Sequence, residues 1–363
     1  MRTSEVSLRV VRQLFISIGL SIAMCAAVGC DTKSPASAPG PSPSAMTASS
    51  SGLGAWPPPS LLYFSAYDRK ALGISVDDRY VYWYQEERTF MRGLTSGVGE
   101  PKELMRCGAC DLYQFVADSD TRAVYFLAGQ NVLRVDRESG EQTTLSLDWD
   151  HNMGGIAVDA QFVYTVMPGC AAITRIDKRT LAKEAMRIPG VAFPNRAGVT
   201  QLAVSGTGLL CASPSDIFAI DHWQAEPRHL VQDIGSVWGI VAHDQHGYWL
   251  EANRSPNTIG QVSLTGGTPI RVSEVNQSPQ TMKLINLEPN GQLVYGTGDG
   301  LQTFDRNTNQ FGPLAKIGYV LDLATDSAFV YATIWGKRSH LVNGSAQVDQ
   351  AYYIAKISVQ DLK

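Results

Sequence analysis

The densest group of side chains capable of chemistry lies in one stretch, residues 148–152, which reads DWDHN. Asp148, Asp150, His151 and Asn152 offer carboxylate, imidazole and amide groups within five positions. Such groups can ligate a divalent metal ion, and a carboxylate or the imidazole can act as a general base. A solvated polar loop has the same composition. We therefore keep both interpretations, with the polar loop as the simpler one.

Three other positions could contact a ligand, namely Asn195, Trp238 and His340. Trp238 could stack on a ligand, although packing against its neighbours is the more ordinary role of a tryptophan. His340 follows Lys337 and Arg338, and this basic spot could receive an anionic group or an acidic partner. Unrelated exposed charges would give the same pattern. No G-x-S-x-G sequence is present, so Ser-His-Asp catalysis has no support.

The elements that must position these residues come from a repeat of about 42 residues. The first copy, residues 71–111, contains four short apolar runs separated by polar or glycine-containing turns. Similar sets follow at 112–152, 153–198, 199–236, 237–280, 281–318 and in the remainder of the chain. Four β-rich runs in 40–45 residues are typical of a β-propeller blade. The sequence thus predicts an all-β, seven-bladed propeller of four-stranded blades.

The last repeat has only three such runs, whereas the stretch SLLYFSA at 60–66 belongs to no repeat. We expect this N-terminal strand to be the fourth strand of the last blade, because such closure removes the exposed edge of an open array. The predicted propeller therefore spans residues 60–363. Six or eight blades would require one repeat to be misassigned.

Four aspartates recur directly after the first run of a repeat. A carboxylate there can accept hydrogen bonds from backbone N–H groups of the following turn. We expect these residues to be structural and not a ring of metal ligands; they are Asp77, Asp118, Asp159 and Asp326.

In such a fold, the connections between blades share one face with the loops between second and third strands. Residues 148–154, 194–199 and 233–238 are predicted connections, and residues 335–351 form a long predicted second-to-third-strand loop. Binding specificity usually lies in loops of this kind. The sequence therefore predicts that the candidate residues named above meet at one face, around the mouth of the central channel.

The runs GISVDDRYVYWY (73–84), AVYFLAGQNVLRVDRESGE (123–141) and GIAVDAQFVYTV (155–166) resemble repeats of the NHL/YVTN-like propeller group. That group includes virginiamycin-lyase-like and gluconolactonase-like (SMP-30) proteins. The resemblance implies the fold, and the fold hosts many unrelated functions. The gluconolactonase-like enzymes hold a divalent metal at the channel mouth with carboxylate and Asn side chains, and the lyase-like ones use a His. Comparable places could be taken here by His151, Asn152, Asn195 or Asp233, although no motif matches residue by residue.

The N-terminus has the pattern of a targeting segment. Residues 1–13 contain three arginines against one acid, and the uncharged apolar run 14–29 follows. Sixteen residues of helix reach about 24 Å, which is short of a hydrocarbon core of roughly 30 Å. The sequence thus predicts a secretory signal peptide.

The exit of this segment, Ala27-Val28-Gly29-Cys30, resembles the lipobox of bacterial lipoproteins, with Ala27 in place of the preferred Leu. The resemblance implies that residues 1–29 are removed and that Cys30 carries lipid. Residues 30–59 are rich in Pro, Ser and Ala and suit a disordered tether. We therefore expect a protein anchored in the inner or outer membrane of a bacterial envelope, facing the periplasm or the cell surface.

Four further cysteines, Cys107, Cys110, Cys170 and Cys211, allow three pairings. Cys107 and Cys110 form a C-x-x-C pair, which is also found in redox and zinc sites. A redox pair favours a helix N-terminus and a zinc site needs a second pair nearby, and neither is predicted here. We expect a local Cys107–Cys110 disulfide and a Cys170–Cys211 disulfide between the third and fourth repeats.

Composition limits the classes of partner. The net charge is −4 and no long basic run exists, which argues against nucleic acid. We expect a monomeric binding or scaffold module for a protein, glycan or small ligand. The alternative is a metal-dependent hydrolase or lyase with its site at the channel mouth. No cofactor is predicted beyond a possible divalent metal.

Overall fold

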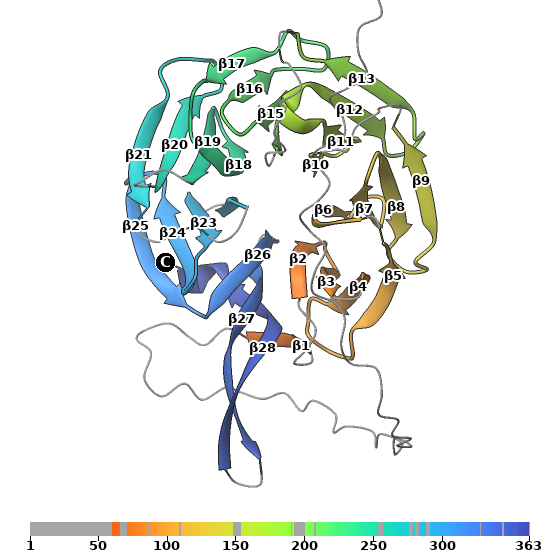
Figure 1. Cartoon of the computed structure of the whole chain (residues 1–363), viewed down its shortest axis with the longest axis vertical. Helices are drawn as coiled ribbons and strands as arrows, with labels where there is room; N and C mark the ends of the chain where they lie inside the picture. The colour runs from red at the N-terminus through yellow and green to blue at the C-terminus, as the bar shows by residue number, and fades with distance from the viewer. Residues whose placement is uncertain are drawn as a thin grey trace, which may run out of the picture. The chain divides into compact units, whose positions relative to one another are not determined.

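The structure is a computed structural model, and the ring of sheets that it forms is shown in Figure 1. The described residues are 60–65, 71–85, 88–108, 110–147, 154–189, 191, 200–206, 208–252, 257–275, 279, 283–287, 291–326, 328–342 and 345–362. Within them, no helix is long and apolar enough to cross a membrane.

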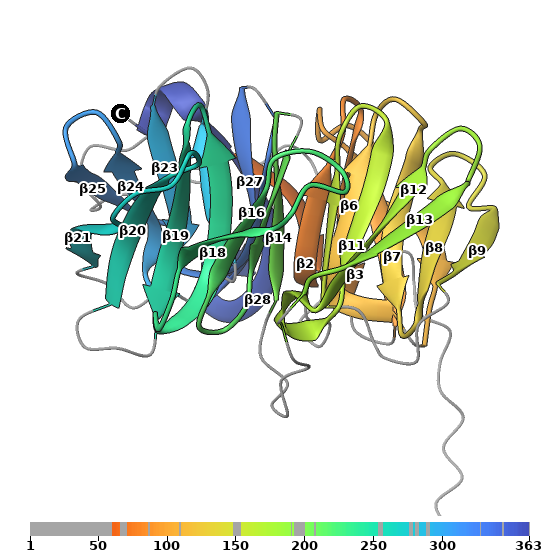
Figure 2. The ribbon, with the colours of Figure 1, turned by 90° about the horizontal axis from the view of Figure 1, so that it is seen from above.

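Seven antiparallel four-stranded sheets surround one axis, which confirms the predicted seven-bladed propeller (Figures 1 and 2). From the axis outward, blade 1 contains β2 (Ala71–Val76), β3 (Tyr80–Gln85), β4 (Thr89–Leu94) and β5 (Lys102–Arg106), and blade 2 contains β6 (Cys110–Asp118), β7 (Ala123–Ala128), β8 (Asn131–Asp136) and β9 (Gln142–Ser146). Blade 3 contains β10 (Gly155–Val158), β11 (Phe162–Val166), β12 (Ala172–Asp177) and β13 (Lys183–Arg187), and blade 4 contains β14 (Gln201–Ser205), β15 (Gly208–Ala212), β16 (Ile217–Ile220) and β17 (Arg228–Val231).

The remaining blades follow the same plan. Blade 5 contains β18 (Ser236–His243), β19 (His246–Ala252), β20 (Asn257–Ser263) and β21 (Ile270–Val275), and blade 6 contains β22 (Ile285–Leu287), β23 (Gln292–Gly296), β24 (Gly300–Asp305) and β25 (Gln310–Lys316). Blade 7 contains β26 (Tyr319–Thr325), β27 (Phe329–Val342), β28 (Ser345–Ser358) and, outermost, β1 (Ser60–Ser65). Two short 3₁₀ turns complete the described chain, η1 (Pro168–Cys170) and η2 (Val359–Leu362).

The N-terminal strand closes the ring as the sequence predicts. β1 pairs antiparallel with β28, from Ser60 opposite Lys356 to Ser65 opposite Tyr352. The Tyr63 hydroxyl donates a hydrogen bond to the carbonyl of Leu94 in blade 1, and the Tyr63 ring stacks on Trp83. The first strand of the chain thus joins the last blade to the first.

The core is divided among the interfaces between blades. Each neighbouring pair of blades shares one cluster of buried apolar side chains, contributed mainly by first, second and third strands. Aromatic residues of the second strands, such as Tyr82, Tyr125 and Tyr331, are fully buried there. Blade-to-blade packing therefore supplies the apolar burial that a single thin blade lacks.

One expectation about blade 7 is wrong. Residues 335–351 were expected to form a loop, but β27 and β28 continue in register through most of this stretch, as far as Val342 opposite Ser345. The two residues between them are Asn343-Gly344, a dipeptide that favours the tight turn of a β-hairpin. The loop was predicted because this stretch is polar. The structure instead has a two-stranded ribbon, which extends beyond the ring in Figure 1.

Candidate functional site

Most residues predicted to line the channel mouth lie outside the described residues; these are Asp148, Asp150, His151, Asn152 and Asn195, together with the lipid-attachment candidate Cys30. Trp238 is half-buried in β18, at an irregularity in its pairing with β19. His340 lies in β27 opposite Gln347, in the ribbon of blade 7. Among the described residues, no group of three His, Cys, Asp or Glu side chains is arranged to hold a metal ion.

The four described cysteines form the two expected disulfides. Cys107 and Cys110 are bonded to each other in the connection between blades 1 and 2. Cys170, at the end of η1 in blade 3, is bonded to Cys211 in β15 of blade 4. The second bond is therefore a covalent link between neighbouring blades.

The recurring aspartates hold the turns between first and second strands, as predicted. Asp77 Oδ1 accepts hydrogen bonds from the backbone N–H groups of Arg79 and Tyr80, at 2.8 and 2.7 Å. Asp159 and Asp326 repeat this arrangement, and each also accepts a hydrogen bond from a tyrosine hydroxyl of the second strand.

Two of these aspartates also bind a cation from the next blade. Asp77 Oδ2 lies 2.8 Å from Arg137 Nη1 of blade 2, and both side chains are almost fully buried. Asp118 Oδ1 lies 2.8 Å from Lys178 Nζ of blade 3, again in a buried pair. Each pair, here called an interblade lock, joins a first-to-second-strand turn to the third-to-fourth-strand turn of the following blade.

The corresponding positions between blades 4 and 5 are different. In each lock, the backbone N–H of the cationic residue donates a hydrogen bond to a carbonyl in the first-to-second-strand turn of its own blade. Arg137 donates to Arg122 in blade 2, and Lys178 donates to Gln161 in blade 3. Leu264 of blade 5 makes the same bond to Gln245. Leu264 therefore takes the place of the cation. In blade 4, Ser205 ends the first strand where Asp118 ends it in blade 2. Both charged partners of a lock are absent at this interface.

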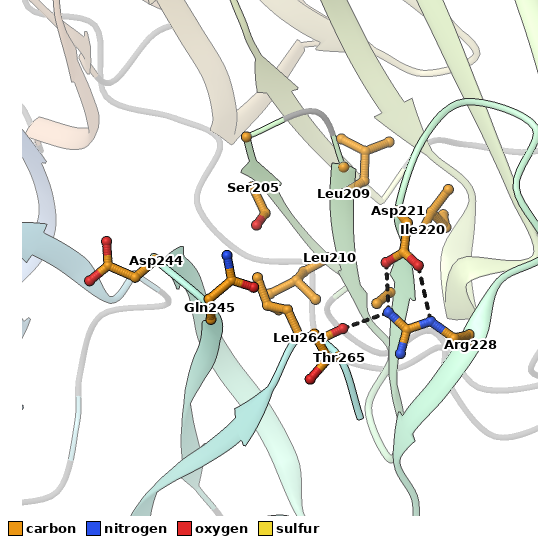
Figure 3. Close-up of a pocket in the computed structure, with 13 residues that line it drawn as sticks. Ser205, Leu209, Leu210, Ile220, Asp221, Arg228, Asp244, Gln245, Leu264 and Thr265 are labelled. Carbon is orange, nitrogen blue, oxygen red and sulfur yellow. Dashed lines mark hydrogen bonds and ion pairs between the residues drawn. The ribbon is translucent and has the colours of Figure 1, made fainter. Parts of the chain in front are cut away.

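A cavity of about 520 Å³ lies at this interface between blades 4 and 5. We call it the interblade niche; Figure 3 shows its residues, which include Ser205, Leu209, Leu210, Asp221, Arg228, Asp244, Gln245, Leu264 and Thr265. The glycine at position 208 is required here, because a Cβ would lie 2.6 Å from the carbonyl oxygen of Ile220. The start of β15 therefore lies in close contact with the end of β16.

The niche has an aliphatic middle and polar sides. Leu210 and Leu264 lie between Asp244 and Gln245 at one side and the Arg228–Asp221 pair at the other (Figure 3). Leu210 is fully buried, whereas the polar side chains are exposed or half-exposed. Such a combination of apolar surface and a few convergent polar groups is typical of small-molecule sites.

Three hydrogen bonds hold Arg228 in the niche. Its Nε and Nη2 donate to the two carboxylate oxygens of Asp221, at 3.2 and 2.6 Å, and Nη2 also donates to the carbonyl of Leu264 at 2.5 Å. The hydrogen bond from Arg228 lowers the pKa of Asp221 below its ordinary value, against a weaker opposing effect of burial. Among the described residues, Nη1 of Arg228 has no acceptor, so a donor is left for a bound molecule (Figure 3).

A second cluster of charges lies at the first strands of blades 7 and 1. Asp322 Oδ2 accepts hydrogen bonds from the backbone N–H of Ile74 and from Lys283 Nζ, at 2.7 and 2.8 Å. Lys283 Nζ also donates to the carbonyl of Ile74. Burial raises the pKa of Asp322, against the effect of the Lys283 ammonium. Because the cluster satisfies the open edge of β2, we interpret it as a brace across blades 6, 7 and 1.

The sequence contained a signal for the niche. An Asp with a cation sixty positions later occurs twice, as Asp77 with Arg137 and Asp118 with Lys178. In the fourth repeat, Ser205 stands at the position of the recurring Asp. In the fifth repeat, the apolar Leu264 stands at the position of the cation. Aligning the repeats for cations as well as aspartates would have indicated this interface among others, because Thr95 in blade 1 and Val359 in blade 7 also stand at the cation position.

Comparison with known proteins supports the fold. No family model matches the chain, and no curated protein matches its sequence. A virginiamycin B lyase from Staphylococcus aureus is similar in structure, with a TM-score of 0.59 at 15% identity over 80% of this chain and 96% of that one. U3-55K gives a TM-score of 0.57 at 12% identity over 81% of this chain and 100% of that one.

The extracellular domain of the putative one component system BT4673 from B. thetaiotaomicron is also similar, with a TM-score of 0.58 at 10% identity. That match covers 84% of this chain and 40% of the other. At these identities the similarity extends to the fold and not to the function. The chain is a seven-bladed β-propeller of the architecture that virginiamycin B lyase also has.

Proposed function

We propose that this protein is a lipid-anchored binding propeller of the bacterial envelope that holds a short, uncharged glycan in the interblade niche. The observation that carries the proposal is the interface between blades 4 and 5, where Ser205 and Leu264 stand at the two positions of an interblade lock and a cavity of about 520 Å³ is present. This volume lies within the range of small-ligand sites, about 300–1,000 Å³.

The polar groups of the niche favour a ligand rich in hydroxyls. A hydroxyl both donates and accepts hydrogen bonds. The carboxylates of Asp221 and Asp244 and the amide of Gln245 provide acceptors, while Nη1 of Arg228 and the same amide provide donors. The partly exposed Leu264 offers apolar surface to the C–H groups of a sugar ring, with the buried Leu210 beneath it.

The charges of the niche favour an uncharged ligand. Asp221 is paired with Arg228 by two hydrogen bonds. Asp244 lies 2.8 Å from the imidazole of His243. Because the guanidinium of Arg228 already has a carboxylate partner, a strongly anionic ligand would find no unpaired positive charge among these groups.

Binding is tested with the fragment Thr47–Lys363, which contains every strand of the ring. Titration calorimetry against neutral mono- and disaccharides, including N-acetylglucosamine, is expected to give a dissociation constant at or below the millimolar range for at least one sugar. Arg228→Met should weaken that binding at least tenfold, because it removes the free donor and the anchor of Asp221. Arg106→Met is the matched control, since Arg106 is in an exposed pair with Glu103 in blade 1.

A second variant tests the site without removing Arg228. Ser205→Asp combined with Leu264→Lys installs at this interface the pair that Asp118 and Lys178 form between blades 2 and 3. The new pair should fill the niche and abolish sugar binding while the ring remains folded. The proposal is wrong if no sugar binds, or if binding survives both variants unchanged.

The anchor is supported by residues 1–30, with a basic start, a short apolar run and Cys30 at its exit. Two acyl chains on one residue are sufficient for stable membrane attachment. We expect Cys30→Ser to move the protein from the membrane fraction to the soluble fraction. A protein that stays in the membrane fraction after this change would contradict the lipid anchor.

A further inference from the structure

The guanidinium of Arg228 is fixed in position on one side of the interblade niche. Its Nε and Nη2 are bonded to the Asp221 carboxylate, and Nη2 is also bonded to the carbonyl of Leu264. Because a guanidinium is planar and rigid, these bonds also set the position of Nη1. In the described part of the chain, no acceptor is bonded to Nη1. A guanidinium donates and never accepts, so a ligand atom that meets Nη1 must be an acceptor.

The neighbouring turn of blade 5 leaves this donor uncovered. Position 266 is a glycine with a φ of +100°, and a Cβ there would lie 3.7 Å from Nη1 of Arg228. Any other residue at this position would therefore place its side chain in contact with the donor. A positive φ of this kind also favours glycine. Gly266 thus keeps one approach to Nη1 open.

An aliphatic surface lies beside the same donor. The carbonyl of Leu264 is bonded to Nη2 at 2.5 Å, so Leu264 and the guanidinium are immediate neighbours. The Leu264 side chain is partly exposed and lines the cavity together with the buried Leu210. Both leucines lie between Arg228 and the side formed by Asp244 and Gln245 (Figure 3). The niche therefore has a donor and an aliphatic surface side by side, with acceptors further across.

An acetamido group has the complementary arrangement. Its carbonyl oxygen is an acceptor without a proton, whereas a hydroxyl bound to Nη1 would still need an acceptor for its own proton. Its methyl group is attached to the carbonyl carbon and gains from contact with an aliphatic surface. The group is also neutral, which suits a guanidinium whose charge already has the Asp221 carboxylate as partner.

We propose, on the basis of the glycan-binding function stated above, that the interblade niche selects acetamido sugars over sugars that have only hydroxyls. Nη1 of Arg228 donates to the acetamido carbonyl, and the acetamido methyl lies on Leu264. The sugar ring lies toward Asp244 and Gln245, whose oxygens accept hydrogen bonds from ring hydroxyls. Leu264 is then a specificity-determining residue, because its aliphatic side chain favours a methyl group over a hydroxyl.

Titration calorimetry of the fragment Thr47–Lys363 with three neutral sugars tests the proposal. N-acetylglucosamine has the whole acetamido group, N-formylglucosamine lacks only its methyl, and glucose has a hydroxyl in its place. We expect N-acetylglucosamine to bind at least tenfold more tightly than glucose. It should bind about fourfold more tightly than N-formylglucosamine, which is the factor given by burial of one methyl group.

Two variants of Leu264 test where the methyl is recognised. Leu264→Asn replaces the aliphatic side chain by a polar one of similar size, and it should make N-acetyl- and N-formylglucosamine bind alike. Leu264→Met is the matched control and should retain the preference, because methionine keeps a large apolar side chain. The backbone groups of residue 264 that bind Gln245 and Arg228 are unchanged in both variants.

Equal binding of N-acetylglucosamine and glucose would overturn the selection of acetamido sugars and leave the glycan-binding function in place. A preference for N-acetyl- over N-formylglucosamine that survives Leu264→Asn would also overturn it, because the methyl would then be recognised elsewhere. If no sugar binds to the unmodified fragment, both the selection and the glycan-binding function are wrong.

Discussion

The interface between blades 1 and 2 and the interface between blades 4 and 5 have the same backbone plan and opposite chemistry. At the first, Asp77 and Arg137 form a buried pair that fills the space between two turns. At the second, Ser205 and Leu264 take the corresponding positions and a cavity remains. Two positions, one in each of two neighbouring repeats, thus distinguish a structural contact from a candidate site.

The exposure of the charges differs as well. The side chains of the Asp77–Arg137 pair are 0% and 7% exposed, whereas those of the Asp221–Arg228 pair are 56% and 36% exposed. Removing one partner of a buried pair leaves the other charge buried and uncompensated, which lowers stability. An exposed pair contributes little to stability. Arg137 is therefore expected to stabilise the fold, while Arg228 is available to bind.

The interface between blades 3 and 4 is held together by a third kind of contact. Its contacts include the packing of Trp223 against Tyr164 and of the Arg175 guanidinium over the Trp223 ring. The Cys170–Cys211 disulfide joins the same two blades. The open interface is thus adjacent to a covalently closed one, which keeps β15, a wall of the niche, in place.

The largest effect is expected from Arg137→Met. This change leaves the carboxylate of Asp77 buried without its cation, and loss of one partner of a buried pair costs about 3–5 kcal/mol. The free energy of unfolding, measured by urea denaturation of the fragment Thr47–Lys363, should decrease by that amount. The remaining bonds of Asp77 to backbone N–H groups favour the lower end of the range.

Arg228→Met is the matched variant at the open interface and should change the free energy of unfolding by less than about 1 kcal/mol. Similar losses in the two variants would contradict the distinction between a locked and an open interface. A loss in Arg228→Met larger than in Arg137→Met would reverse it.

The fold was predictable because its signals are local and repeated. Four apolar runs in about 42 residues recur seven times, and the missing fourth strand of the last repeat is found in the stretch at 60–66. The turn aspartates were predictable for the same reason, since Asp77 binds N–H groups only two and three residues away. The disulfide of Cys107 with Cys110 also follows from short spacing.

The niche was not predicted from the sequence, because it forms where two residues far apart in the chain, Ser205 and Leu264, have no charged side chain. Ser205 and Leu264 are unremarkable in their own repeats, and only the packing of blade 4 against blade 5 makes their small or apolar character matter. The ribbon of blade 7 was not recognised as strands because alternation was weak and its residues are polar. For the cluster at 148–152, the sequence prediction stays a prediction.

A smaller loss of stability is expected when the disulfide beside the niche is removed. Cys170 and Cys211 are 41 residues apart, so the bond restricts the unfolded chain considerably, and its loss should lower the free energy of unfolding by about 2–4 kcal/mol. Cys170→Ala with Cys211→Ala tests this by urea denaturation. Cys107→Ala with Cys110→Ala is the control, because closing a loop of three residues restricts the unfolded chain much less. Equal losses of stability in the two double variants would mean that linking blades 3 and 4 does not itself stabilise the protein. The open interface would then owe its shape to packing alone.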